Sequence, residues 1–260
     1  GCPCTRANIR AMSVTNGFSN MQRHHTLRPA LAAVLAVAGT LASLPAQAGR
    51  PLQTEDAGVL DRGACEVEGV ASRVSLAGVH ATGQSLQLGC GIGYASQLAL
   101  AATRARALGE TATGWALGGK TELWRGAGNE PAALALAYGL AWERGGGQSL
   151  RHAASGMRAV YSRPMGPGVF HANLGYDRDE IAREGATVWN LAWEHEGYDV
   201  GGIRLAPMAE VFGAEGESAW WNLALRATVV PDKFYIDGSY GRQSGDGRPK
   251  LFTLGLKFAF

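Results

Sequence analysis

Charged residues at alternate positions of otherwise apolar segments are the groups in this sequence that could act on a solute. If those segments are β-strands, the charges share the face that carries the small residues, because successive side chains of a strand point to opposite sides. The candidates on that face are Glu66, Glu68, Lys120, Glu122, Arg204, Glu210, Arg226, Lys233, Asp237 and Lys257. Enclosed by a sheet, they would be partly removed from water and would need partners of opposite sign.

Cross-strand pairing predicts which of these charges meet. With the last hairpin centred near Gly247, Asp237 would face Lys257, and Arg226 on the preceding strand would lie diagonal to Asp237. Closure of the sheet would place Lys257 beside the two glutamates of the first strand. We therefore expect a charged ladder lining a lumen. The alternative is that these groups only neutralise one another, because about twelve strands enclose a narrow interior that side chains can fill.

Catalytic and cofactor chemistry finds little support in the residues. A serine nucleophile needs a histidine within hydrogen-bond reach. The histidines beyond residue 49 are His80, His152, His171 and His195. None lies in a His-x-Ser arrangement of the kind that outer-membrane phospholipases use, and the nearest match, residues 171–173, lacks the serine. We expect no enzyme, no cofactor and no metal site.

Two cysteines, Cys65 and Cys90, follow residue 49. If the first hairpin turns near Ala77 and Gly78, the cysteines lie opposite each other on neighbouring strands. An exported setting favours their oxidation, so we predict a disulfide. The alternative is a pair of free or metal-binding thiols, although a zinc site would need more ligands than these two.

Alternation of apolar residues runs from about residue 64 to the C-terminus. The last segment places Phe252, Leu254, Leu256, Phe258 and Phe260 on one face, and its final Phe resembles the signal that outer-membrane barrels present to their assembly machinery. Similar segments cover residues 64–76, 82–91, 93–105, 111–125, 131–143, 155–164, 168–178, 185–196, 202–213, 217–229, 233–243 and 250–260. The pattern predicts an all-β fold, a transmembrane antiparallel up-and-down β-barrel of about twelve strands whose bulky rows face lipid. A soluble β-sandwich is the alternative.

The connections predict an orientation. If both termini face the periplasm, the turns at 164–167 and 231–232 lie on that side. The longer charged connections at 143–152, 177–185 and 243–249 then lie outside the cell. Short periplasmic turns and longer external loops are typical of such barrels.

The N-terminal part is typical of an export signal. Cationic residues at 23–28 precede an apolar stretch over 30–44, and residues 46–48 form a small-x-small cleavage site. We predict an upstream extension over 1–20, a signal peptide over 21–48, a periplasmic N-terminal segment over 49–63 and the barrel over 64–260. A membrane anchor helix is the alternative, but the apolar run is shorter than the roughly 20 residues that a span needs.

The charge balance excludes one class of partner. The chain has 24 basic and 22 acidic residues, and removing the four arginines before the cleavage site leaves 20 basic residues against 22 acidic ones. A nucleic-acid partner would require a strongly basic face, so none is expected. The partners we expect are outer-membrane lipid and lipopolysaccharide, the barrel-assembly machinery and a small solute, in the bacterial outer membrane.

Residues 50–60, followed by Gly63 and the Glu66-Val67-Glu68 strand, resemble the opening of a family of proteobacterial outer-membrane proteins. That family is described as transporter-like barrels and grouped under the meta pathway of phenol degradation. The resemblance implies a barrel and passage of small aromatic or otherwise hydrophobic compounds. We expect a passive channel. The alternatives are a structural or adhesive barrel with a plugged lumen and a lipid-modifying barrel enzyme.

Overall fold

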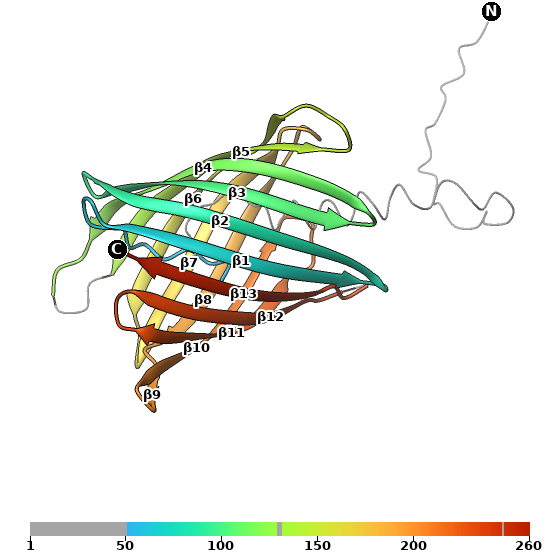
Figure 1. Ribbon diagram of the computed structural model, residues 1–260. Coiled ribbons are helices and arrows are strands. Elements are labelled where there is room, and N and C mark those ends of the chain that lie inside the picture. Colours follow the sequence, from blue (N-terminus) through green and yellow to red (C-terminus); the bar gives the residue numbers. More distant parts are fainter. Residues whose placement is uncertain (1–50, 129–131, 246) are drawn as a thin grey trace, which may run out of the picture.

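The structure, a computed structural model, describes residues 51–128, 132–245 and 247–260 (Figure 1). The predicted extension and signal peptide lie outside these residues. Thirteen strands form one antiparallel sheet in the described part of the chain. They are β1 (Cys65–Leu76), β2 (Val79–Gly93), β3 (Ser96–Ala107), β4 (Glu110–Arg125), β5 (Ala133–Gly145), β6 (Arg151–Pro164), β7 (Gly168–Asp179), β8 (Glu184–His195), β9 (Tyr198–Val200), β10 (Ile203–Ala214), β11 (Trp220–Val230), β12 (Phe234–Gln243) and β13 (Lys250–Ala259).

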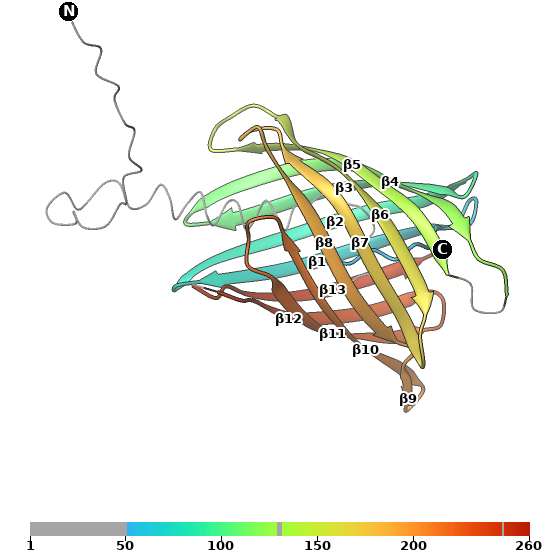
Figure 2. The ribbon, with the colours of Figure 1, turned by 180° about the vertical axis from the view of Figure 1, so that it is seen from behind.

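The sheet closes on itself, as the sequence predicts. Strand β13 pairs with β1 from Glu66 opposite Ala259 to Ser75 opposite Lys250, and the backbone of Phe260 exchanges two hydrogen bonds of 2.9 Å with Cys65. The result is a 12-stranded antiparallel barrel, visible from both sides in Figures 1 and 2. The unforeseen β9 is a three-residue strand that pairs only with the start of β10 and extends beyond the barrel wall.

The two faces of each strand differ in the way that the alternation predicts. Along β13 and at Phe260 after it, the side chains at even positions from 252 to 260 point outward, and Phe260 is 63% exposed, whereas Leu251 faces the interior and is 2% exposed. No second sheet covers this exterior within the described residues, so the bulky rows form a belt suited to hydrocarbon. No helix in the described part of the chain is long and apolar enough to cross a membrane.

The first hairpin has the predicted register. Ala77 and Gly78 form the turn with φ of 47° and 83°, which is the left-handed conformation that a two-residue hairpin turn demands. Cys65 therefore lies opposite Cys90. The predicted disulfide joins them, with 4.1 Å between their Cα atoms.

The last hairpin departs from the predicted register. Its Gly247 centre would pair Asp237 with Lys257, but Asp237 lies opposite Gly255. The backbone N–H of Gln243 donates to Pro249 O at 3.0 Å, so the hairpin is centred one residue earlier. A shift of one residue in the centre moves each cross-strand partner by two positions, which preserves the inward face but changes the neighbours.

Two predicted pairs are corrected, the first by this shift and the second by the register of the β11–β12 hairpin. Lys257 lies opposite Tyr235 instead of Asp237, and Arg226 lies directly opposite Asp237 instead of diagonal to it. The predicted position of Lys257 beside the glutamates of β1 is present, because Glu68 faces Lys257 across the closure.

The connections are more even in length than the orientation rule predicts. At the end opposite the C-terminus, the strands extend into the three loops predicted to be long, which leaves residues 146–150, 180–183 and 244–249 between strands. At the end that carries the C-terminus and the start of β1, β4 and β5 are joined through residues 126–132, and a longer connection contains β9. The orientation predicted from the sequence makes this the periplasmic end, and we use the names periplasmic end and outer end in the sense of that prediction.

Candidate functional site

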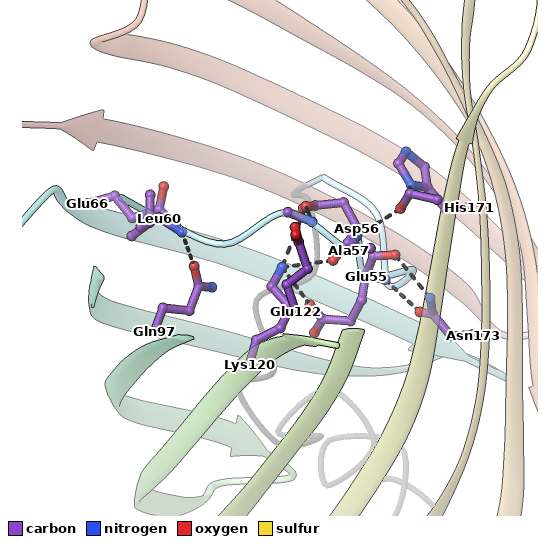
Figure 3. Close-up of polar contacts among 12 residues, drawn as sticks. Glu55, Asp56, Ala57, Leu60, Glu66, Gln97, Lys120, Glu122, His171 and Asn173 are labelled. Carbon is purple, nitrogen blue, oxygen red and sulfur yellow. Dashed lines mark hydrogen bonds and ion pairs between the residues drawn. The ribbon is translucent and has the colours of Figure 1, made fainter. Parts of the chain in front are cut away.

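The segment before the barrel runs through the barrel interior. The sequence analysis places residues 49–63 ahead of the first strand. In the structure residues 51–60, here called the lumen segment, lie inside the bore (Figure 3). Leu52 is 2% exposed, and Glu55 and Ala57 are 0% exposed. The lumen segment adds no strand to the sheet, so its buried backbone groups must find side-chain partners on the wall.

Glu210 on β10 holds one end of the lumen segment. Its carboxylate accepts hydrogen bonds from the backbone N–H groups of Gln53 and Thr54 at 2.9 Å and from the Thr54 hydroxyl at 2.7 Å. Asn222 on β11 donates to the same carboxylate at 2.8 Å. Asn190 on β8 completes the contact by donating to Gln53 O at 3.0 Å. Three strands thus converge on two residues of the lumen segment.

The middle of the lumen segment contacts β6 and β7. Asn173 accepts from the backbone N–H of Glu55 at 2.7 Å and donates to its carbonyl at 3.0 Å, so one amide satisfies both backbone groups. The N–H of Ala57 donates to Ser162 Oγ at 2.8 Å. Ser162 Oγ in turn lies 2.8 Å from His171 Nδ1. These side chains replace the strand partner that the segment lacks.

Lys120 on β4 is the cation that faces the lumen segment (Figure 3). Its ammonium donates to Asp56 O at 2.8 Å and lies 3.5 Å from Asp56 Oδ1 and 3.8 Å from Glu55 Oε2. Neither carboxyl oxygen of Glu55 has a hydrogen-bond partner. Burial raises the pKa of Glu55 to about 8, although the charge of Lys120 opposes that shift. Glu55 is therefore mostly protonated when docked at neutral pH.

The segment meets the wall at β2 and β3. The N–H of Leu60 donates to Gln97 Oε1 at 2.6 Å, and the N–H of Gly91 donates to Ala64 O at 2.9 Å. A Cβ atom at Gly91 would overlap the carbonyl oxygens of Leu60 and Asp61. Glycine at position 91 is thus what allows the two backbones to approach.

Small apolar residues make room for the segment between these polar contacts. One buried cluster contains Leu52, Ala192, Ala206, Met208 and Ala224. A second contains Ala57, Ala133, Ala135, Ala137 and Val160. The alternating alanines of β5, which the sequence predicts to face the lumen, are therefore the wall against which Ala57 packs.

The structure brings some of the sequence-predicted charges together on the wall. The ammonium of Lys257 contacts Glu66 and lies 3.6 Å from Glu68. Asp237 is buried on the neighbouring strand. Arg226 forms an ion pair of 3.1 Å with Glu194, a residue that the sequence analysis passed over.

Other predicted charges lie toward the periplasmic end. Arg204 pairs with Asp199 of β9 at 3.2 Å, and Glu122 pairs with Arg125. Lys233 is exposed in the turn between β11 and β12, because β12 begins only at Phe234. Glu210 and Lys120 are the predicted residues that bind the lumen segment.

The uncharged polar residues of the wall escaped the sequence analysis. Those that hold the segment are Gln97, Ser162, Asn173, Asn190 and Asn222. Each occupies an inward position of an alternating strand. An amide or hydroxyl side chain at such a position was the signal that could have found them. Many other inward positions are occupied by alanine, so a polar residue there indicates a specific contact.

The two ends of the bore differ. At the periplasmic mouth an open cavity of about 370 Å³ is lined by residues that include Glu194, His195, Arg204 and Arg226. At the outer end Val74, Ala81, Ala107 and Leu251 form a buried apolar cluster, against which Val79 and Trp220 pack. The rings of Trp220 and Phe212 stack with centroids 6.1 Å apart. We call these inward apolar side chains the outer collar. Across the described residues, no group of three or more potential metal ligands is found.

Comparison with known proteins identifies the architecture. No family model matches the sequence, and no curated protein does. The NanC porin has a TM-score of 0.52 at 9% identity, over 74% of this chain and 98% of that one. The β domain of the Bordetella autotransporter BrkA has a TM-score of 0.49 at 17% identity, over 77% and 100%. Omp33 of Acinetobacter baumannii has a TM-score of 0.45 at 13% identity, over 76% and 98%.

At these identities the likeness is one of fold. The fold is that of bacterial outer-membrane β-barrels, and the closed sheet with its apolar exterior is suited to hydrocarbon on every side. By its closed sheet and its apolar exterior, the protein is a transmembrane β-barrel.

Proposed function

We propose that the protein is a passive channel for small solutes and that the lumen segment is its gate, here closed. The observation that carries the proposal is the way in which the segment is held. Its polar contacts inside the bore are hydrogen bonds and ion pairs with wall side chains, as at Glu210 and Asn173, and Leu52 and Ala57 pack against apolar side chains of the wall. The segment can therefore leave without breaking a single strand pair of the barrel.

The wall left behind by the segment supports a water-filled passage. Glu210, Asn173 and Lys120 would lose their partners in the segment, and in the open state water would replace them. A polar interior is what an aqueous channel through a barrel requires. The mouth cavity of about 370 Å³ already gives water access to the bore from the periplasmic end.

The outer collar supports a class of solute. Trp220, Phe212 and Leu251 present aromatic and aliphatic surface at the external end of the bore. Such surface favours flat apolar groups over sugars. The proposed solutes are therefore small aromatic or otherwise hydrophobic compounds, in agreement with the resemblance of residues 50–60 to the transporter-like family of phenol degradation.

A reversible cross-link tests the gate. Ala57 and Val160 belong to one buried cluster, so cysteines at both positions should lock the segment to β6 when oxidised. We expect single-channel current in planar bilayers from the A57C/V160C protein under reducing conditions and its loss on oxidation. The single variants A57C and V160C serve as controls for the effect of the redox buffer on the native disulfide.

Two results would overturn this proposal. Current that persists in the cross-linked protein would mean that the segment does not gate. No current under any condition, together with no uptake of aromatic carboxylates by loaded liposomes, would favour the structural barrel with a permanently plugged lumen. An adhesive role has little support, because the external turns include connections as short as Ala77–Gly78.

The lipid-modifying enzyme is the remaining candidate. Ser162 and His171 form a hydrogen-bonded pair that the sequence analysis missed, because the two residues come from neighbouring strands. The pair faces the lumen beneath Ala57, and His171 is buried. Acyl chains of membrane lipid contact the opposite face of the wall, so this position supports a role in holding the gate.

We also propose that β13 is the segment that the barrel-assembly machinery recognises. The side chains of Phe252, Leu254, Leu256 and Phe258 on β13, and of Phe260 directly after it, all point outward and are exposed. The rings of the last two aromatics stack with centroids 5.9 Å apart. Deleting Phe260 should lower the amount of heat-modifiable barrel in outer-membrane fractions, whereas an unchanged yield would remove this role.

A further inference from the structure

The outward face of one half of the barrel carries charge of a single sign. On β1–β5, β12 and β13 the charged side chains that alternate with inward residues and point outward are Arg73, Arg104, Arg106, Arg144, Arg242 and Lys250. No Asp or Glu occupies an outward position on these strands within the described residues. We call these six cations the outer basic patch.

The registers place these cations beside one another. Arg73 and Arg106 both face Thr82, from β1 and from β3. On the other side of β1, Arg242 faces Lys250, and Lys250 faces Ser75. Directly opposed side chains of an antiparallel pair have Cβ atoms about 4.5–5.5 Å apart. These four cations therefore lie on contiguous strands of one wall.

The patch continues across β4 and β5. Arg104 faces Thr113, and Thr113 faces Arg144. The residues between the cations are hydroxyl-bearing, as Thr82 and Thr113 are, and can donate hydrogen bonds to an anion. The patch thus alternates positive charge with neutral donors.

All of these positions lie at the end of the barrel opposite the C-terminus, where β1 ends and β2 begins. An open hollow of about 570 Å³ at the same rim, between the β1–β2 turn and the loop after β12, is lined by residues that include Arg242, Arg248 and Lys250. No ion pair joins these three side chains to an acid in the described residues. The rim therefore has space beside its cations as well as charge.

The apolar belt begins directly beneath the patch. On β3 the exposed Leu100 precedes Arg104 by four residues, on the same outward face. On β2 the exposed Leu86 and Leu88 follow Gln84 on that face. A ligand that fits this surface has acyl chains against the leucines and anionic groups at the level of the arginines. Arginine forks bind phosphate oxygens in pairs, and basic clusters beside a membrane attract anionic headgroups.

We propose that the outer basic patch binds the phosphate groups of a glycolipid of the outer leaflet. The arginines of β1 and β3 hold one phosphate against the wall, and Arg242 with Lys250 holds another at the rim. Neutralisation by phosphate would explain why these strands keep six cations at the edge of hydrocarbon with no ion pair to an acid in the part of the chain that the structure describes. The site is independent of the gate, because it lies on the opposite face of the wall.

Native mass spectrometry of the full barrel in detergent tests the site with lipid A that carries two phosphates. We expect Arg104→Gln combined with Arg106→Gln to weaken binding about thirtyfold, since each cation near an anionic headgroup contributes roughly a factor of five. Lys250→Gln alone gives a second variant with a smaller expected loss of about fivefold. The matched control is Arg163→Gln, an outward arginine at the periplasmic end.

A comparison of two lipids distinguishes binding of the phosphate groups from binding of the acyl chains. Lipid A with both phosphates removed should bind the native protein as weakly as the doubly phosphorylated lipid binds the variant. Inorganic phosphate should not compete, because it lacks the acyl chains. Heat-modifiable migration on a gel shows that each variant has folded. Equal binding by native protein, the double variant and Arg163→Gln, or equal binding of the dephosphorylated lipid, would overturn the proposal.

Discussion

The lumen face and the outward face of the same strands carry their charges in opposite ways. On the lumen face acids and bases meet each other or the lumen segment, as Lys257 meets Glu66 and Lys120 meets Asp56. On the outward face near the external rim the charges are all positive. Charge that is compensated within the chain holds the chain in place, whereas uncompensated charge marks a surface that needs an external anion.

The lumen face also shows how a segment can be held without becoming a strand. Asn173 bonds both backbone groups of Glu55, and Glu210 collects two successive N–H groups. Side chains in this role leave the sheet intact when the segment departs. Such a device suits a gate, because only the side-chain contacts must be remade.

The largest effect should come from the lumen-face residue with the most contacts. Glu210→Ala leaves the donors of Gln53, Thr54 and Asn222 without their acceptor. Asn222 loses its acceptor whether or not the segment is docked, so only the two N–H groups of the segment count. At about 1–2 kcal/mol for each lost bond, docking should weaken by about 2–4 kcal/mol and the open fraction should rise by a factor of roughly 30 to 1,000. Single-channel recording measures this fraction.

The matched control is Glu184→Ala, an exposed acid on β8 at the external end. It should leave the open fraction unchanged. If both variants opened the channel equally, the change in net charge would be responsible. The contacts of Glu210 on the lumen face would then not be what holds the segment.

A smaller effect should follow from a change in the wall that touches no charge. Gly91→Val places side-chain atoms where the carbonyls of Leu60 and Asp61 now lie. Overpacking of this kind costs about 1–3 kcal/mol, and the segment can relieve it by moving away. Protease sensitivity of the lumen segment, measured in intact folded barrels, should increase. Gly69→Ala is the control, because nothing lies within 4 Å of a Cβ there.

The pH dependence of the gate should follow Glu55. The docked state raises the pKa of Glu55 from 4.5 to about 8 by burial, with Lys120 and Arg158 lowering it and Asp56 and Glu68 raising it. Docking therefore takes up a proton. It is strongest below the undocked value and weakens as pH rises toward 8, so the open fraction should increase with pH over this window.

Substitution of Glu55 isolates its contribution. Glu55→Gln keeps the shape of the side chain and removes the titration, so the open fraction should be nearly constant over the same window. His171 also faces Asp56, and His171→Asn is the matched control, which should keep the pH dependence. A pH dependence that survives in Glu55→Gln and disappears in His171→Asn would assign the effect to the imidazole.

The barrel could be predicted because its signals are local. The alternation on the last strand and the two-residue turn at Ala77 and Gly78 depend on neighbours in the sequence, and the turn determines that Cys65 meets Cys90. The same locality explains the failure at the last hairpin. Nothing in residues 243–249 distinguishes a centre at 246 from one at 247, and the choice rests on the bond from Gln243 to Pro249.

The position of the lumen segment inside the bore could not be predicted, because its contacts with the wall join residues far apart in the chain. Thr54 and Glu210 are separated by 156 positions, and Glu55 and Asn173 by 118. Residues 51–60 have no strand alternation and thus indicate only a connection. The sequence marks Glu210 and Lys120 as inward charges, but the binding partner comes from a segment that the pattern leaves outside the barrel.

The smallest effect on stability should come from the outward face. It tests whether the charges of that face, unlike those of the lumen face, are unpaired within the fold. In detergent without glycolipid, Arg104→Gln with Arg106→Gln should change the free energy of unfolding by less than about 0.5 kcal/mol, because solvated surface charges contribute little to stability. Urea denaturation followed by tryptophan fluorescence measures it. A loss of stability as large as that of Glu210→Ala would mean that these arginines have partners within the fold. Without glycolipid, removal of a charge lowers the free energy of unfolding only if that charge is paired within the chain.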